Sequence, residues 1–136
     1  MVPILRASRL KSLFLIGGDV RLSDGAIISS DAIKEISNYK FDFAVIGASS
    51  LDADGSILDF DQREVLMTRA IVQNARKTIL VMDVSKFELS APFKICDAKD
   101  LDYVILNASP PPTFENSLLG QSTTLIIARE KNARTK

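Results

Sequence analysis

Five short apolar runs divide this chain, and they constrain its fold more than any other feature of the sequence. Four of these runs stop at a glycine, an aspartate or an asparagine, residues that favour turns. Runs of four or five residues without polar alternation predict strands that are buried on both faces, as in a parallel sheet. The runs are Leu13–Ile16, Phe43–Ile46, Thr78–Met82, Tyr103–Leu106 and Thr123–Ile127.

Helical patterns separate these runs, and they extend over Ser30–Asn38, Gln62–Arg76 and Pro112–Leu119. A serine or an aspartate can cap the first helix, and Gly120 ends the third. Asp61 can cap the second helix, and Glu64, three residues later, completes a capping-box pattern. The side chains expected in the core are Ala32, Ile33 and Ile36 from the first helix and Leu66, Met67, Ala70 and Ile71 from the second.

The order of these elements predicts the fold class. Asp52–Ser56 has the composition of a tight turn that joins two short extended arms. The complete order is strand, helix, strand, hairpin, helix, strand, loop, strand, helix, strand. This alternation predicts an α/β fold with a largely parallel sheet flanked by helices, and a length of 136 residues suits one domain over residues 1–136.

Composition and charge exclude several classes of protein. No apolar run approaches the ~20 residues that span a bilayer, and the first residues lack the pattern of a signal peptide. The single cysteine, Cys96, permits no internal disulfide, so we expect a soluble cytoplasmic domain. Seventeen basic and seventeen acidic residues cancel and histidine is absent, which argues against direct DNA binding and against a metal site. The basic stretch over residues 129–136 is expected to be a flexible tail.

Candidate ligand-binding residues follow from the expected sheet. Ligands of open α/β sheets gather beyond the carboxyl ends of the strands, where loops and helix N-termini expose backbone N–H groups. The candidates are therefore the glycines and polar residues that follow the first three runs, together with two residues on the central helix. They are Gly17, Gly18 and Arg21; Gly47, Ser49, Ser50 and Asp52; Asp83, Ser85 and Lys86; and Glu64 with Arg69 on the helix.

Most of these candidates also have a purely structural interpretation. The glycine pair can form a tight turn, and Arg21 can either hold a phosphate or pair with Asp19 or Asp24. The capping box explains Glu64 without any ligand. Asp52 is most simply a turn residue.

The segment after the third run is more suggestive of a ligand. Lys86 comes three residues after Asp83, so a cation and an acceptor lie over the same crevice at a strand end. A lysine in that position is a suitable point charge for a phosphate. A salt bridge or a turn stabilised by a serine hydroxyl would also explain the segment.

Five segments of the sequence occur in a characteristic order and spacing over residues 13 to 128. They are Leu15-Ile16-Gly17-Gly18-Asp19-Val20-Arg21, Asp42-Phe43-Ala44-Val45-Ile46-Gly47-Ala48-Ser49, Asp52-Ala53-Asp54-Gly55, Glu64 with Arg69, and Asp83-Val84-Ser85-Lys86-Phe87. Together they resemble the C-terminal sensor domain of the DeoR family of bacterial transcription repressors. That domain is similar in fold to ribose-5-phosphate isomerase, so the resemblance implies a Rossmann-like sheet of the ribose-5-phosphate isomerase and CoA-transferase type.

The resemblance also implies a function, namely an effector-binding regulatory domain with no catalysis, cofactor or metal. The effector would be a phosphorylated sugar or polyol, the domain would form a homo-oligomer, and effector binding would release operator DNA. The expected pocket residues divide by role. Gly17, Gly18 and Arg21 would form one wall, Gly47 to Asp52 the floor beside the sugar hydroxyls, Glu64 and Arg69 would project from the helix, and Lys86, oriented by Asp83, would meet the anionic end.

Three departures from the family pattern change these expectations. The winged helix-turn-helix of the family is missing, so DNA would be contacted only through a domain outside this chain. The opening β/α unit, which in relatives carries an Asp-x-Gly-Thr-Thr-like phosphate loop and a Thr-Asn segment, is missing too. The pocket is therefore expected to be open on one side, and the sheet to have an unpaired edge. Ser30-Asp31-Ala32 also stands where relatives often have Gly-Pro-Ala.

Two other functions stay open at this point. An aldose–ketose isomerase acting on a phosphosugar would use Glu64 as its base and Lys86 as an electrophilic helper. Against it, the Gly47–Ser50 loop lacks the acidic pair that isomerases place there. The third alternative is an interaction module whose pocket binds nothing.

Overall fold

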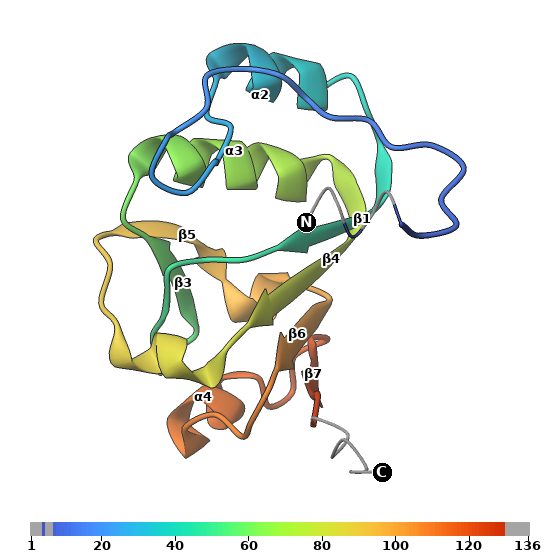
Figure 1. The fold of residues 1–136 in the computed structure, drawn as a ribbon. Coiled ribbons are helices and arrows are strands. Elements are labelled where there is room, and N and C mark those ends of the chain that lie inside the picture. The colour runs from blue at the N-terminus through green and yellow to red at the C-terminus, as the bar shows by residue number, and fades with distance from the viewer. Residues whose placement is uncertain (1–3, 5–6, 130–136) are drawn as a thin grey trace, which may run out of the picture.

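Four strands form a parallel sheet in the order β1-β4-β6-β7 (Figure 1). In the computed structural model, residue 4 and residues 7–129 are described. The register places Ile46 of β1 beside Leu80 of β4, and Met82 of β4 beside Leu106 of β6. The predicted α/β class and parallel sheet are therefore confirmed. The strands are β1 (Phe41–Ile46), β4 (Ala75–Met82), β6 (Tyr103–Leu106) and β7 (Thr124–Ile127).

A second, antiparallel sheet has the order β2-β3-β5 and comprises β2 (Ser50–Leu51), β3 (Ser56–Asp59) and β5 (Phe93–Asp97). The predicted turn joins β2 to β3, and it is closed by the Asp52 N–H, which donates to the Ser56 carbonyl at 2.9 Å. Gly55 adopts a φ of 97° in this turn, a left-handed conformation that favours glycine. Strand β5 was not predicted, because only Ile95 of its five residues is buried and the segment shows no apolar run.

Three α-helices are described, namely α2 (Ser30–Ile36), α3 (Gln62–Gln73) and α4 (Pro112–Ser117). Ser29 and Asp61 cap the first two helices, because their side-chain oxygens accept the N–H of the residue two positions later. The end predicted for the second helix was wrong: Asn74 caps α3, and the chain enters β4 at Ala75. Among the described residues, no helix combines the length and apolar character needed to cross a membrane.

The main core lies between the two sheets and α3. Helix α3 packs against both sheets, and α2 packs on α3 (Figure 1). Leu66, which was expected in this core, is half exposed, and Val65 is buried instead. The 3-10 helix η2 (Ala98–Asp100) and α4 complete the core with Ala98 and Phe114. The largest side chains that are fully buried are Phe114, Leu51, Ile57, Leu80, Leu101, Leu106 and Val104.

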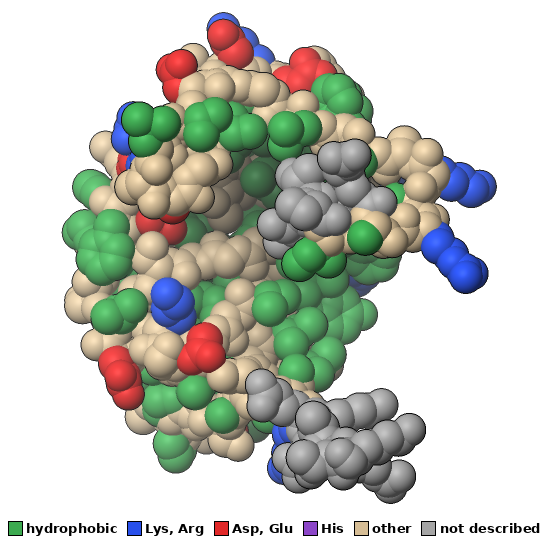
Figure 2. Space-filling model, in the orientation of Figure 1, with side chains coloured by type: hydrophobic (Ala, Val, Ile, Leu, Met, Phe, Trp, Pro, Cys, Tyr) green, Lys and Arg blue, Asp and Glu red, His purple; other side chains and the backbone are tan. Residues whose placement is uncertain are grey.

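The other face of the parallel sheet is open, so the prediction of strands buried on both faces was wrong for the described residues. Phe43 and Val45 of β1 are 62% and 66% exposed, and Val81 and Ile126 continue the same face across the sheet. Figure 2 shows apolar side chains gathered over β4, β6 and β7. A solvent-facing apolar surface of this kind is unusual for an isolated domain.

The first predicted strand, Leu13–Ile16, is not a strand. A strand forms by pairing, and among the described residues neither this segment nor the outer edge of β1 pairs with a strand. Phe14 and Leu15 are therefore 68% and 63% exposed instead of buried. The predicted tail falls mostly on residues 130–136, which lie outside the described residues.

Candidate binding site

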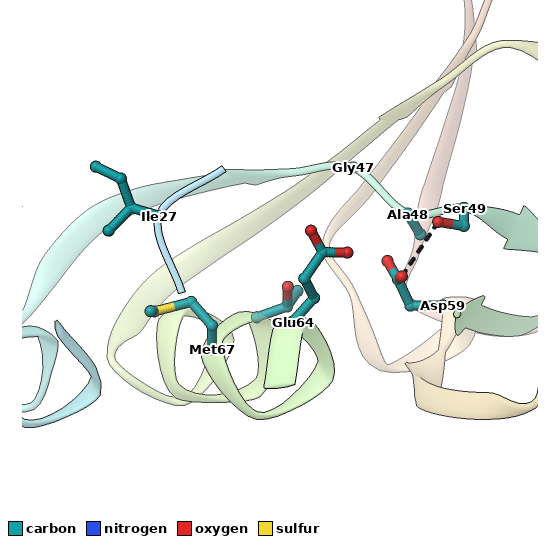
Figure 3. A pocket seen from close by; sticks show the side chains of 8 residues that line it. Ile27, Gly47, Ala48, Ser49, Asp59, Glu64 and Met67 are labelled. Atoms are coloured by element: carbon teal, nitrogen blue, oxygen red, sulfur yellow. Dashed lines mark hydrogen bonds between the residues drawn. The ribbon is translucent and has the colours of Figure 1, made fainter. Parts of the chain in front are cut away.

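A cavity of about 330 Å³ lies at the carboxyl end of β1, where the sequence predicted a ligand site (Figure 3). The backbone leaves β1 at Gly47, passes through the cavity wall and enters β2. The first turns of α3 and the end of β3 form the opposite side. The lining residues are Ile27, Gly47, Ala48, Ser49, Asp59, Glu64, Met67 and Thr68.

Asp59 is the buried carboxylate of this cavity, and the sequence did not single it out. Its side chain is held where β3 ends, because Oδ1 accepts the Ser49 hydroxyl at 3.1 Å and the Phe60 N–H at 2.7 Å. The Asp61 N–H donates to the same oxygen at 3.3 Å. In the predicted capping box, the Asp61 N–H would donate to the Glu64 side chain. Because it donates to Asp59 instead, the capping box does not form. Glu64 is free to face the cavity instead.

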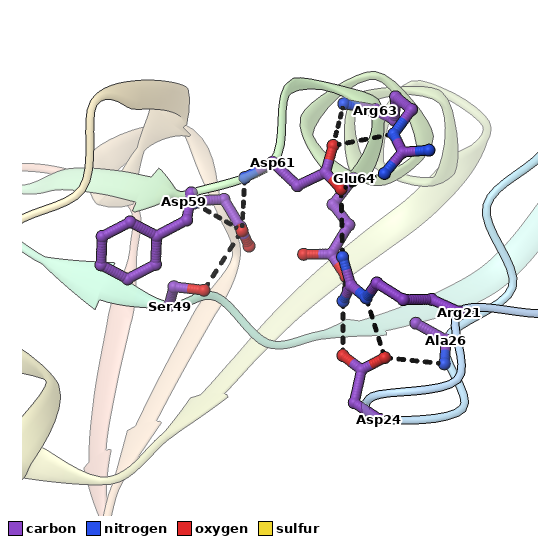
Figure 4. Close-up of polar contacts among 9 residues, drawn as sticks. Arg21, Asp24, Ala26, Ser49, Asp59, Asp61, Arg63 and Glu64 are labelled. Carbon is purple, nitrogen blue, oxygen red and sulfur yellow. Dashed lines mark hydrogen bonds and ion pairs between the residues drawn. The ribbon is translucent and has the colours of Figure 1, made fainter.

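Arg21 is surrounded by three carboxylates beside the cavity (Figure 4). Its Nε donates to Asp24 at 2.9 Å and its Nη1 to Asp61 at 3.1 Å, while Nη2 pairs with both Asp24 and Glu64. The side chain is only 28% exposed. Arg21 therefore joins the segment before α2 to the first turn of α3.

The carboxylates around Arg21 differ in their proton affinity. The hydrogen bonds from Arg21 lower the pKa of Asp24 to about 2, and those from Arg63 lower the pKa of Asp61 to about 2. The pKa of Glu64 moves in the opposite direction and is raised. Burial is the main cause and the neighbouring Asp59 carboxylate adds to it, and together they outweigh the attraction of Arg21. The surroundings of Glu64 therefore disfavour its ionised form.

The segment over residues 17–29 forms a small hairpin that carries Arg21 and places Ile27 in the cavity wall. The Arg21 N–H donates to the Ala26 carbonyl at 2.8 Å, and the Gly25 N–H donates back to the Arg21 carbonyl at 2.8 Å. Gly18 lies where the hairpin meets α2, and a Cβ there would lie 2.6 Å from the Cβ of Ser29. Only glycine fits that close approach without a shift of the chain.

A second group of polar residues lies at the ends of β4 and β6. Asp83 caps the 3-10 helix η1 (Val84–Glu88) by accepting the Ser85 N–H at 2.9 Å, and its other oxygen accepts the Asn107 side-chain N–H at 2.6 Å. These hydrogen bonds, chiefly those from Ser85, lower the pKa of Asp83. Within the part of the chain that the structure describes, Lys86 forms no ion pair. Asn107 was not predicted as a site residue, although it ends an apolar run as Asp83 does.

The other predicted site residues lie apart from the cavity. Arg69 points to the opposite side of α3, where its guanidinium donates to the carbonyls of Lys94 at 2.6 Å and Ile95 at 3.1 Å. Asp52 closes the β2–β3 turn through its backbone. Gly17 has open space where a Cβ would lie. Among residues 7–129, no group of three acidic or cysteine side chains could hold a metal ion.

A family model described as the DeoR C terminal sensor domain matches residues 2–108. The chain belongs to this family. The resemblance inferred from the five segments is therefore confirmed, and this DeoR sensor domain has the α/β fold expected of it. Individual relatives support the same assignment.

Over 128 residues, this sensor domain is 36% identical to the glycerol-3-phosphate regulon repressor of Haemophilus influenzae. The aligned region covers 94% of this chain and 49% of that protein. It is 40% identical over 99 residues to the protein of the same name in Escherichia coli, covering 73% of this chain and 39% of that protein. The E. coli transcriptional repressor CsqR is 24% identical over 114 residues, 84% of this chain and 44% of that protein. The chain thus spans half the length of these relatives or less, and their names favour a regulatory function over an isomerase.

Proposed function

We propose that this chain is the effector-sensing part of a DeoR-type transcription repressor and that it binds a phosphorylated polyol or sugar. One observation carries the proposal: acceptor carboxylates line a cavity at the end of β1, and Lys86, which forms no ion pair among the described residues, follows the neighbouring strand β4. Two relatives are named glycerol-3-phosphate regulon repressors, so glycerol 3-phosphate is the first ligand to test.

The hydroxyl groups of the effector would enter the cavity. Asp59 and Glu64 present carboxylate oxygens there, and Ser49 presents a hydroxyl that already bonds to Asp59. Hydroxyl donors suit carboxylate acceptors, and such charge-assisted hydrogen bonds are about twice as strong as neutral ones. Gly47 leaves the cavity rim without a side chain, which gives the ligand access.

The phosphate would lie outside the carboxylate-lined part of the cavity. Three carboxylates contact Arg21 and Arg63 at the cavity entrance, and Asp59 adds a fourth inside the cavity, so an anion placed there would meet net repulsion. Lys86 forms no ion pair within the described residues, and Asp83 attracts it only at longer range. We therefore assign the phosphate to Lys86, with Asp83 and Asn107 fixing the backbone that carries it.

The regulatory role requires partners beyond the effector. The balanced charge of this chain gives no basic face for DNA, so operator binding is assigned to a separate winged helix-turn-helix domain in the cytoplasm. We assign homo-oligomer formation to the open sheet face, where Phe43 and Val45 are exposed, and to the edge of β1 that pairs with no strand among the described residues.

Calorimetry on this chain tests the proposal with glycerol 3-phosphate, glycerol, inorganic phosphate and ribose 5-phosphate. Saturable binding of a phosphorylated polyol or sugar, stronger than that of glycerol or phosphate alone, is expected. Absence of heat with every phosphorylated ligand would refute effector binding by this chain. An isomerase assay with ribose 5-phosphate runs beside it, and measurable turnover would contradict the regulatory assignment.

A further inference from the structure

The hairpin over residues 17–29 lies at the wall of the cavity, and little apolar packing holds it in place. Val20 and Leu22 are 55% and 98% exposed, so the hairpin tip buries almost nothing. Ile27 is the one residue of the hairpin that lines the cavity. Segments with few buried side chains open at low cost in free energy.

Arg21 provides the charged connection between this hairpin and α3. Its contacts with Asp24 stay within the hairpin, so they would move with it. Its contacts with Asp61 and Glu64 join the hairpin to the first turn of α3 instead. The ion pairs of Arg21 with Asp61 and Glu64, here called the latch, are part-buried and involve no other hairpin residue among those described.

The latch shares one of its groups with the proposed ligand site. Glu64 lines the cavity and accepts Arg21 at the same time. A ligand hydroxyl that donates to Glu64 competes with Arg21 for the same carboxylate. Partly exposed ion pairs of this kind are weak enough for one or two ligand contacts to replace them.

We propose that the latch is an autoinhibitory contact: effector binding breaks the ion pairs of Arg21 with Glu64 and Asp61 and frees the 17–29 hairpin from α3. The inference rests on the proposed function, since it concerns the same cavity. It adds the conformational output that a sensor domain needs, because a ligand can shift an equilibrium only through contacts that differ between its two states. In the effector-free state the hairpin is held closed, and in the bound state it is released.

Hydrogen exchange tests the ligand-free part of the proposal on the whole chain. The N–H groups of Arg21, Gly25, Ala26 and Ile28 are hydrogen bonded inside the hairpin and report its state. R21Q should raise their exchange roughly fivefold or more, the lower bound of typical coupling between sites. R76Q is the matched control, because Arg76 pairs with Asp42 and donates to the Lys40 carbonyl, and none of these residues belongs to the latch or to the hairpin. Equal exchange in R21Q and R76Q would overturn the latch.

The ligand arm uses glycerol 3-phosphate at a concentration that calorimetry shows to be saturating. Exchange at the same four amides should rise in the wild type and should not rise further in R21Q. Unchanged or slower exchange in a wild-type chain that binds the ligand would overturn the proposal while leaving effector binding intact. Failure of the proposed function would look different, since no phosphorylated ligand would then produce calorimetric heat.

Discussion

Arg21 and Glu64 are 43 positions apart in the chain, yet they form an ion pair at the mouth of the candidate cavity. Glu64 keeps a raised pKa in spite of this partner, because it is partly desolvated and faces Asp59. The pair therefore connects the hairpin before α2, the cavity and the first turn of α3. A ligand that contacts Glu64 would therefore affect the hairpin, the cavity and α3 together.

Asp59 is expected to be the carboxylate on which the local structure most depends. Its Oδ1 accepts one hydroxyl and two backbone N–H groups in a buried position. Asp59→Ala should lower the free energy of unfolding by about 1–3 kcal/mol, because these donors lose their partner. Urea denaturation measures this change. Asp42→Ala, at a carboxylate that is 84% exposed, is the control and should change stability by less than about 0.5 kcal/mol; equal losses would contradict the role given to Asp59.

The hairpin should lose stability as the solution becomes acidic. The pKa of Asp24 is lowered from 3.8 to about 2 by Arg21, so its ionised form stabilises the folded hairpin above pH 3.8, and this contribution is lost as the pH falls toward 2. Asp61 acts in the same direction. Glu64 acts in the opposite direction, because its pKa is raised in the folded state. Its contribution to the free energy of unfolding is present at low pH and is lost as the pH rises through that pKa.

The Ala26 amide reports this titration, since its N–H donates to Asp24 Oδ1 at 3.1 Å. In NMR spectra its shift should titrate with a midpoint of about 2 in the wild type. In R21Q the midpoint should move toward 3.8, the ordinary value for an aspartate. Identical midpoints in the two proteins would show that Arg21 does not lower the pKa of Asp24.

Lys86 should contribute to affinity and little to stability. Loss of one charge-assisted contact costs roughly 1.5–3 kcal/mol, so Lys86→Ala should weaken binding of glycerol 3-phosphate by about 10- to 150-fold. Lys34→Ala is a matched control at a lysine of α2 whose side chain is 80% exposed. Calorimetry on both variants gives the comparison. Unchanged affinity in Lys86→Ala would remove Lys86 from the phosphate site.

The open sheet face should drive self-association. Val45→Lys places a charge on this face at a side chain that is 66% exposed, so it should reduce the dimer fraction without unfolding the chain. Leu22→Lys is the control, because Leu22 is 98% exposed but lies on the hairpin tip. Sedimentation velocity over a concentration series distinguishes the variants. A wild-type chain that stays monomeric, or an equal effect of both substitutions, would assign the oligomer to another surface.

Four of the five predicted strands could be found from the sequence because their apolar runs reflect one buried face and a parallel partner. Leu13–Ile16 shows the same pattern but has no partner strand among the described residues, and pairing is a tertiary property that composition does not contain. The sequence did not predict β5 for the opposite reason: this segment has a partner strand but no apolar run. It pairs with β3 at the edge of the small sheet, where only Ile95 needs to be apolar.

The candidate site was predicted in outline from one rule, that ligands gather at the carboxyl ends of parallel strands. That rule led to Gly47 and Ser49, which line one cavity together with Glu64 of the central helix, but it gave no reason to choose Asp59, which resembles a turn residue in sequence. Arg69 was grouped with Glu64 although residues five apart on a helix point roughly 140° from each other. The structure accordingly directs Arg69 to the backbone of β5.

Mapping the ligand by NMR tests the central claim most directly. In two-dimensional spectra of the labelled chain titrated with glycerol 3-phosphate, the largest shift changes should fall on Gly47, Ser49, Asp59 and Glu64, with a second group around Lys86. A separate cavity, lined in part by Arg69, Gln73 and Cys96, lies on the other side of α3. Shift changes confined to that cavity, or none at saturating ligand, would contradict the account.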